Sequence, residues 1–267
     1  MLSIAGSDSS CGAGIQSDIK TITSLGAHPL TAVTAVTAQN SLGIVSIHRI
    51  PARFVSLQIE SVLEDVFPHA VKIGMLGTGS VVRATAKVLG KYGLQRIVLD
   101  PVLRATAGGT LLEPEALSLL RERLLPLAAV VTPNLEEAGI LTGGTVRNLK
   151  DMEAAARAIR TLGPDVVVTG GHLRGDPVDL VYDGKITRLV AGPRIETPHT
   201  HGSGCVFSSA LATFLAMGHG VGEAARHAQA FTRAAIERGY ACGRGAGAVR
   251  PSGLHGTGPN EANLQNE

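Results

Sequence analysis

Residues 197–205 read Thr-Pro-His-Thr-His-Gly-Ser-Gly-Cys and place two histidines, two glycines and a cysteine directly before an apolar helical pattern. Side chains of these types could form a metal centre, a nucleophile with its base, or a cradle for an anion. The glycines allow a ligand to approach the backbone, and a helix expected to begin near Ser203 would present free N–H groups and the positive end of its dipole. Such a turn holds an anion, most often a phosphate, although an ordinary loop-to-helix turn shares the pattern.

The other two kinds of site have weaker support. His199, His201 and Cys205 do not follow a spacing typical of zinc ligands, and a fourth ligand is not evident. A nucleophilic Cys205 would need a base and a third residue to orient it, and acyl-transfer motifs are missing. The helix end would lower the pKa of Cys205, a bound phosphate would raise it, and a small buried thiol could simply pack. The sequence leaves these alternatives open.

Two carboxylates and an amide form a second group. Asp100 follows an apolar strand pattern, and Asn134 and Glu137 lie three residues apart on one side of a predicted helix start. Asp100 and Glu137 could hold Mg²⁺ through water, as that ion prefers. Asn134 and Glu137 also fit a helix N-cap and its capping-box partner, and both roles are compatible. Asp18, about one turn into a predicted helix, could bind a polar ligand or lie in solvent.

The elements that position these residues are short β-branched runs alternating with longer helical patterns. The runs predict strands at 2–5, 30–36, 43–50, 70–74, 96–100, 128–132, 165–170, 178–183 and 186–191. Helical patterns lie near 13–24, 53–64, 79–91, 114–124, 148–162, 204–217 and 222–238. This alternation predicts an α/β fold with a mainly parallel sheet covered by helices on both faces.

Two pairs of predicted strands leave no room for a helix between them. The runs 30–36 and 43–50 predict a small antiparallel flap, and 178–183 and 186–191 predict a hairpin at Gly184-Lys185. In open α/β sheets, ligands bind outside the carboxyl ends of the strands. The polar, Gly-rich stretches follow strands at that edge, so we expect one concave site assembled from several loops.

Composition limits the class of protein. The 267 residues are 44% hydrophobic and 17% charged, which is typical of a single folded domain. A net charge of +2 and 3% aromatic residues argue against a nucleic-acid partner and favour a small ligand. Three cysteines without a disulfide pattern, and apolar runs too short for a membrane span, indicate a cytoplasmic protein. We expect the domain to occupy 1–242 and the Gly/Pro-rich segment 243–267 to form a mobile tail.

Taken in order, several stretches resemble one enzyme family. They are "IAGSDSSCGAGIQSDIKT", "TAVTAQNSLG", "VKIGMLG", "VLDPV", "VVTPNLEEA", "GGH" and "THGSGC", and they run from about residue 2 to 240. The chain resembles the hydroxymethylpyrimidine/phosphomethylpyrimidine kinases of thiamine biosynthesis, in the ribokinase-like superfamily. The first and last stretches are specific to that family, whereas Asp-Pro-Val and Asn-x-x-Glu belong to the wider superfamily.

The resemblance implies a three-layer αβα sandwich, a homodimer, and transfer of the ATP γ-phosphoryl group, with Mg²⁺, first to hydroxymethylpyrimidine and then to its monophosphate. It places the pyrimidine against Gly6, Asp18, Gln39, Met75 and Val102. It assigns an anion hole to Gly202, Ser203 and Gly204, and puts Cys205 where many superfamily kinases have an Asp base. It assigns the metal and phosphate end to Asp100, Asn134, Glu137 and Thr169, with Asp100 and Glu137 as the metal ligands.

The chain departs from the family pattern at two places. Thr169 replaces a Lys that often precedes Gly-Gly-His, and residues 106–109 read Thr-Ala-Gly-Gly where relatives often read Lys-Ser-Gly-Asp. Both changes remove positive charge near the expected nucleotide phosphates, and Arg104 is a candidate to compensate. Two alternative functions are a pyridoxal, pyridoxine or pyridoxamine kinase and a non-catalytic ligand-binding module. Gln39 favours the pyrimidine, because an amide can pair with adjacent amino and ring-nitrogen groups.

Overall fold

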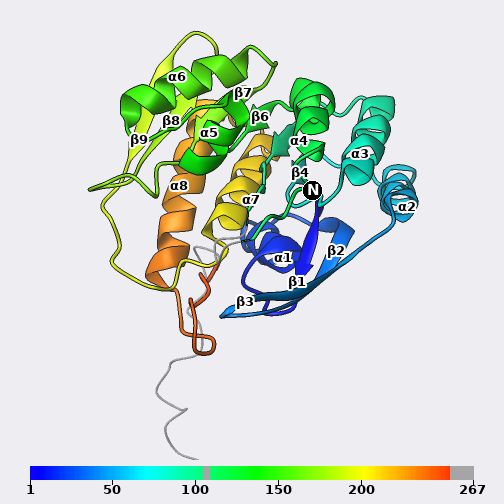
Figure 1. Ribbon diagram of the computed structural model, residues 1–267, viewed down its shortest axis with the longest axis horizontal. Helices are drawn as coiled ribbons and strands as arrows, with labels where there is room; N and C mark the ends of the chain where they lie inside the picture. Colours follow the sequence, from blue (N-terminus) through cyan, green and yellow to red (C-terminus); the bar gives the residue numbers. More distant parts are fainter. Residues whose placement is uncertain (105–108, 253–267) are drawn as a thin grey trace, which may run out of the picture.

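A computed structural model describes residues 1–104 and 109–252. Within these residues, nine strands form one sheet in the order β3-β2-β1-β4-β5-β6-β7-β8-β9 (Figure 1). The strands are β1 (Leu2–Asp8), β2 (Leu30–Asn40), β3 (Gly43–Arg49), β4 (Val71–Ile73), β5 (Ile97–Leu99), β6 (Val130–Val131), β7 (Asp165–Val168), β8 (Val178–Tyr182) and β9 (Thr187–Ala191). β2, β1, β4, β5, β6 and β7 are parallel, whereas β3, β8 and β9 add antiparallel edges.

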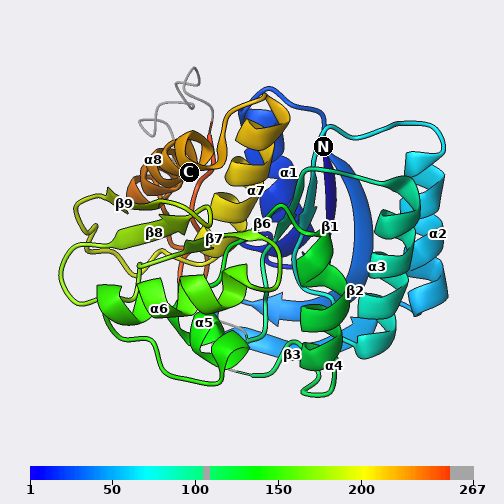
Figure 2. The ribbon, with the colours of Figure 1, turned by 90° about the horizontal axis from the view of Figure 1, so that it is seen from above.

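Helices cover both faces of the sheet (Figure 2). They are α1 (Gly14–Ser24), α2 (Ala52–Leu63), α3 (Gly79–Tyr92), α4 (Ala116–Leu119), α5 (Leu135–Thr142), α6 (Leu149–Arg160), α7 (Ser203–Ala216) and α8 (Val221–Glu237). In one buried cluster, the helices α2, α3, α4, α5 and α6 pack on one face of the sheet. In a second cluster, α1, α7 and α8 pack on the other face. The alternating strand residues Val130 and Val131 lie in different clusters. The predicted αβα layering is thereby confirmed.

Local chemistry explains several helix ends. The Thr78 side chain accepts a hydrogen bond from the Val81 N–H at the start of α3, and Asn148 does the same for Asp151 at the start of α6. Both interactions satisfy N–H groups that a first helical turn leaves without a partner. Gly93 ends α3 in the left-handed conformation, with φ 62°, which glycine adopts without strain.

The structure confirms the predicted flap and hairpin, and it corrects the start and the end of one predicted helix. β2 and β3 pair antiparallel, as do β8 and β9. The helix predicted at 114–124 starts at Ala116 and continues through a π-helical turn (Leu120–Leu124) and a 3₁₀ turn (Leu125–Leu127). In residues 1–104 and 109–252, no helix combines the length and apolar character that a membrane span needs.

The predicted tail is wrong for residues 243–252. Ala248 and Val249 are buried at 2% and 3% exposure. Ala248 pairs with His201 and with Tyr240, and the Val249 N–H donates to the His201 carbonyl oxygen at 3.2 Å. Apolar side chains and strand-like bridges therefore attach this segment to the domain, although its composition predicts irregular chain. Residues 253–267 lie outside the described residues, as do 105–108, which include most of the Thr-Ala-Gly-Gly departure.

Candidate active site

A cavity of about 270 Å³ lies at the carboxyl edge of the sheet. It is lined by residues that follow five parallel strands and by the start of α7, as expected for an open α/β sheet. All but one of the predicted site residues line it: Gly6, Gln39, Met75, Asp100, Val102, Asn134, Glu137, Thr169, Gly202, Ser203, Gly204 and Cys205. A second cavity of about 770 Å³ shares Arg104, Asn134 and Glu137 with the first.

One end of the cavity is apolar and closely packed. A Cβ added to Gly6 would lie 3.0 Å from the Met75 sulfur, so a side chain at position 6 would displace Met75 into the cavity. Met75 belongs to a small cluster that also contains Val102 and Leu111. Flat apolar walls with few polar groups are typical of pockets for small aromatic ligands.

Gln39 is the polar group at this end, and two neighbours hold its side chain. The Thr37 hydroxyl donates to its Oε1 at 3.2 Å, and His201 Nε2 lies 3.4 Å from its Nε2. His201 Nε2 also lies 3.0 Å from an Asp8 carboxylate oxygen. Hydrogen bonds from His201, Ser10 and Ala13 outweigh burial and lower the pKa of Asp8 to about 2. His201 Nε2 therefore donates to a fixed carboxylate, and the Gln39 amide lies beside this pair.

Asp18 is the predicted site residue that does not line the cavity. The expectation that Asp18 contacts the substrate directly is therefore wrong. Its side chain is fully buried and both of its oxygens lie 2.9 Å from Lys72 Nζ. Ser209 donates to the same carboxylate at 2.7 Å. Lys72, also fully buried, lines the cavity instead. Burial alone would lower the pKa of Lys72, but the charges of Asp18 and Asp100 contribute to raising it above its usual value.

Lys72 is the residue that sequence reasoning missed. It lies in β4 between Val71 and Ile73, where an apolar run contains one charged residue. A charge in a central strand needs a buried partner, and that signal was present in the sequence. The sequence could not identify the partner, because α1 brings Asp18 to β4 only in the folded chain.

The first turn of α7 supplies the predicted anion hole with one change. Gly202 caps the helix with φ 87°, and the Gly12 carbonyl oxygen occupies the space that a Cβ would need. The Ser203 N–H donates to the Thr200 carbonyl oxygen at 3.1 Å, so the expectation that it faces an anion is corrected. In the part of the chain that the structure describes, the N–H groups of Gly204 and Cys205 have no protein acceptor.

The Cys205 side chain is partly exposed at the cavity, and its electrostatic surroundings favour one protonation state. Burial raises the pKa of Cys205 to about 12, and the Asp18 and Asp100 carboxylates act in the same direction, against the opposing charge of Lys72. The expected effect of the helix end is therefore outweighed. These surroundings favour the protonated thiol over the thiolate.

Asp100 and Glu137 are the two acidic side chains of the predicted metal site, and both line the cavity. Burial raises the pKa of Asp100, although Lys72 and a 2.8 Å hydrogen bond from Ser208 act against it. Burial and the nearby Asp100 charge raise the pKa of Glu137 to about 8. Asn134 and Glu137 form the expected capping box at the start of α5, with both hydrogen bonds 2.9 Å long.

The metal centre considered for His199, His201 and Cys205 does not form. His201 is bound to Asp8, and His199 packs against Gly247 with its Nδ1 buried and without a partner. Among residues 1–104 and 109–252, the group of three side chains that could hold a metal ion lies elsewhere, at the turn between α7 and α8 and on the start of α8. The segment 197–205 thus contains a helix start with two free N–H groups rather than a metal centre, and its second histidine lies near Gln39.

Arg104 does not stand free at the cavity. Its guanidinium forms a 2.9 Å ion pair with Glu136, and both side chains are more than half exposed. It borders both cavities, so it can approach a phosphate only in competition with this carboxylate. Thr169 is held by its N–H, which donates to Pro133.

Comparisons with known proteins agree on one family. The family model described as phosphomethylpyrimidine kinase matches residues 8–250. The hydroxymethylpyrimidine/phosphomethylpyrimidine kinase of Rhizobium meliloti is 47% identical over 239 residues, covering 88% of this chain and 89% of the relative. The thiamine biosynthesis bifunctional protein ThiED of Geobacter sulfurreducens is 44% identical over 251 residues. That match covers 93% of this chain but 51% of ThiED, so the chain spans about half of that relative.

A solved structure extends the likeness to the fold. The ADP complex of Bacillus subtilis pyridoxal kinase matches with a TM-score of 0.89 and 38% identity, covering 95% of this chain and 97% of the other. The predicted ribokinase-like sandwich is confirmed, and so is phosphotransferase activity. Because one family model covers nearly all of the chain and a relative nearly half identical shares its length, the chain belongs to the phosphomethylpyrimidine kinase family.

Proposed function

We propose that the protein uses ATP to phosphorylate 4-amino-5-hydroxymethyl-2-methylpyrimidine, and then phosphorylates the resulting monophosphate to the diphosphate, in thiamine biosynthesis. The observation that carries this proposal is the continuous cavity that joins Gln39 to the free N–H groups at the start of α7. A ring bound at Gln39 and Met75 can direct its substituent toward those N–H groups. The family match and the named relatives support the same reaction.

The pyrimidine end selects the ring. The Gln39 amide offers both a donor and an acceptor, which suits adjacent amino and ring-nitrogen groups. The hydrogen bond from Thr37 restricts its rotation, so less conformational entropy is lost when the ring binds. Gly6 and Val102 border the ring and Met75 packs on it.

The transfer end stabilises charge. N–H groups of Gly204 and Cys205 face the cavity at the positive end of the α7 dipole, where negative charge develops on the transferred phosphoryl group. In phosphoryl transfer, positioning and electrostatic stabilisation supply most of the catalysis. Cys205 thus acts through its amide, while its protonated thiol lines the hole.

The carboxylates fit a magnesium ion. Asp100 and Glu137 are buried, and the Asp100 charge raises the pKa of Glu137, so a cation between them would relieve that repulsion. When bound, Mg²⁺ neutralises charge on the nucleotide phosphates. Asn134 keeps Glu137 in place through the capping box, and Thr169 lies beside Asn134 at the end of β7.

Substrate choice is the decisive test, since the Bacillus subtilis structure with the TM-score of 0.89 is described as a pyridoxal kinase. ADP release would be measured in a coupled assay with hydroxymethylpyrimidine, its monophosphate, pyridoxal, pyridoxine and pyridoxamine. We expect turnover of both pyrimidines, with kcat/KM at least tenfold above that of every pyridoxal-type alcohol. Turnover of the pyridoxal group alone would make the protein a pyridoxal kinase, and turnover of none would favour a binding module.

We expect Gln39→Leu to impair use of the pyrimidine while ATP binding survives. Leucine has similar size but leaves the buried polar edge of the ring without a partner, at a cost of ~1–3 kcal/mol. Calorimetric titrations with the pyrimidine and with a non-hydrolysable ATP analogue measure the two affinities separately. Gln95→Leu, the same exchange at an exposed position that does not line the cavity, is the control. Unchanged pyrimidine affinity in Gln39→Leu would remove this residue from the site.

We also propose a homodimer in the cytoplasm. The family resemblance supports the dimer, and the three unpaired cysteines support a reducing compartment. Light scattering during size-exclusion chromatography measures the mass of the particle directly, and a monomer mass would contradict the first proposal.

A further inference from the structure

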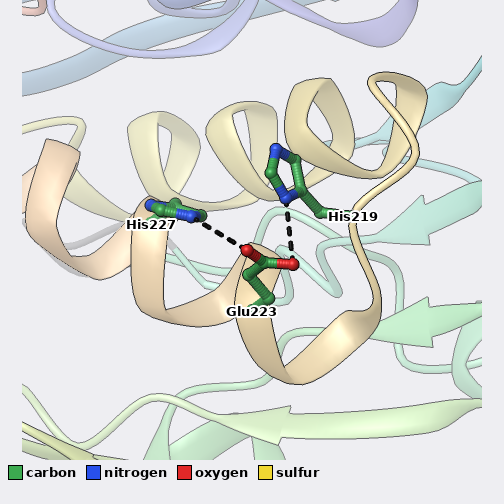
Figure 3. A group of neighbouring side chains, drawn as sticks. All are labelled: His219, Glu223 and His227. Carbon is green, nitrogen blue, oxygen red and sulfur yellow. Dashed lines mark ion pairs between the residues drawn. The ribbon is translucent and has the colours of Figure 1, made fainter.

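Three side chains gather at the turn between α7 and α8, at the opposite end of α7 from the cavity (Figure 3). The chain leaves α7 through Gly218, whose φ is 97°. The Gly218 N–H donates to the Leu215 carbonyl oxygen, and the His219 N–H donates to the Phe214 carbonyl oxygen. This pair of bonds is a Schellman motif, which fixes the position of His219. Glu223 and His227 follow at intervals of four residues, so these two side chains lie on one side of α8, beside His219.

The donor atoms are already close together. His219 Nδ1 lies 3.1 Å from Glu223 Oε2, and His227 Nε2 lies 3.6 Å from Glu223 Oε1. One ligand atom from each residue lies within 4.8 Å of the other two. Ligand atoms about 2.1 Å from a tetrahedral ion lie ~3.4 Å from one another, so small side-chain rotations suffice to surround one ion.

Packing restricts the two imidazoles. The Phe214 ring lies 5.8 Å from the His219 ring and 5.1 Å from the His227 ring, measured between centroids. The histidine rings lie 5.1 Å apart. An aromatic side chain behind both rings limits their rotamers, whereas the exposed outer face, with about a third of each imidazole and half of Glu223 accessible, admits an ion with its water.

We propose that His219 Nδ1, a Glu223 carboxylate oxygen and His227 Nε2 bind a divalent transition-metal ion of the zinc class, with water in the remaining position. Two imidazoles and one carboxylate suit Zn²⁺, whereas Mg²⁺ and Ca²⁺ prefer oxygen ligands. The ion would join the C-terminal turn of α7 to the first two turns of α8. The cluster is about 20 Å from the anion hole along the 14 residues of α7, so the proposal is independent of the kinase reaction.

One neighbouring charge opposes the ion. An Arg226 guanidinium nitrogen lies 3.5 Å from His227 Nε2, the nitrogen assigned to the metal. Arg226 is exposed, so it can turn into solvent when the ion binds. A variant without the Arg226 guanidinium should therefore bind the metal ion more tightly. Loss of folding could not produce that result.

The test uses the full chain after treatment with a chelator and titration of Zn²⁺ against a chromophoric competitor. We expect one site that His227→Gln or Glu223→Gln weakens at least about tenfold, since even outer partners of metal ligands typically contribute 10–100-fold. His69→Gln changes an exposed histidine outside the cluster and should bind Zn²⁺ like the wild type. Arg226→Gln should bind it more tightly. Circular dichroism checks the fold of each variant.

A second readout places the ion. Zn²⁺ bound at the turn should raise the melting temperature of the wild type and of His69→Gln, but not that of His227→Gln. The visible absorption of the Co²⁺ form reports tetrahedral coordination and should disappear in the same variant. Equal Zn²⁺ affinity in the wild type, Glu223→Gln and His227→Gln would overturn the proposal, as would absence of binding by the folded wild type.

Discussion

Lys72 and Asp18 form a fully buried ion pair under the cavity. Their contact satisfies two charges that would each be costly to bury alone. Ser3 and Ser209 donate further hydrogen bonds to Asp18, and the nearby Gly74 leaves room for the ammonium, because a Cβ there would lie 2.8 Å from Lys72 Nζ. The ammonium is therefore held at a fixed position beside Asp100 and Cys205, where it acts on the electrostatics of the site.

Whether the Cys205 thiol acts as a general base can be tested with the two proposed phosphoryl transfers, because only the first requires the acceptor to lose a proton. The alcohol must lose a proton, whereas a phosphate monoester with a second pKa of ~6 is mostly ionised at neutral pH. A general base typically contributes ~10²–10⁴-fold where a proton must move. Because the pKa of Cys205 is raised to about 12, we expect Cys205→Ala to slow both transfers by a similar factor, below about tenfold, in single-turnover measurements.

The contrary outcome has a distinct signature. A first transfer slowed about 10²-fold or more, with the second nearly unchanged, would make Cys205 the general base. Cys205→Ser in the same measurements controls for the volume of the side chain.

Glu137 should make stability depend on pH. Its folded-state pKa of about 8 lies above the ordinary 4.5, so between these values the folded protein keeps a proton that the unfolded chain has lost. The free energy of unfolding should therefore fall as pH rises from about 4.5 to about 8. Glu137→Gln removes the charge and retains a capping-box side chain, so its stability should decline less over this range.

Urea unfolding at pH 5.5, 7 and 8.5, with and without Mg²⁺, measures this effect. Mg²⁺ should stabilise the wild type more at pH 8.5 than at pH 5.5, because it binds the ionised carboxylates, and should stabilise Glu137→Gln less. Parallel pH profiles for the two proteins would show that Glu137 ionises normally, and an equal Mg²⁺ effect would place the ion elsewhere.

At the scale of the element, α7 is organised so that its first turn faces the ligand. A Cβ at Gly204 would meet nothing within 4 Å, so Gly204→Val should fold but fill the space where a phosphate approaches. We expect its kcat to fall at least about 10²-fold, the typical effect of losing an oxyanion contact. Gly220→Val, at the equally open start of α8, is the matched control and should keep normal turnover. Near-normal kcat in a folded Gly204→Val would exclude the anion hole.

The elements show how far the sequence determines the fold. Alternating β-branched runs and helical patterns predicted where the strands and most helices lie along the chain, since periodicity reports which face is buried. The pattern around Asn134 predicted the start of α5 because a capping box is local. The Lys72–Asp18 pair was not predictable in the same way, because its partners are 54 residues apart and meet only in the sheet. The pairing of Gln39 with His201, 162 residues away, was missed for the same reason.

At the scale of the whole molecule, residues 243–252 complete the domain. We expect a chain ending at Cys242 to be less stable than one ending at Ser252, because burying Val249 alone is worth ~1.5–3 kcal/mol. The shorter chain should also lose activity, since Gly247 and Val249 form hydrogen bonds with the backbone of His201. Thermal unfolding and the coupled kinase assay compare the two chains with the full one. Equal melting temperatures for the two truncated chains would contradict this role.

The bond between Val249 and His201 also sets when the site can form during synthesis. The first strand leaves the ribosome early, but the loop that follows it packs against Gly202 through Gly12. His201, beside Gly202, is in turn bound by the N–H of Val249. At 5–20 residues per second, translation reaches residue 249 only after roughly 10–50 s. Until then a nascent chain carries Asp8 and Gln39 without His201 fixed beside them. Kinase activity should therefore appear only after residue 249 has left the ribosome, and a ribosome stalled before that point should hold an inactive intermediate.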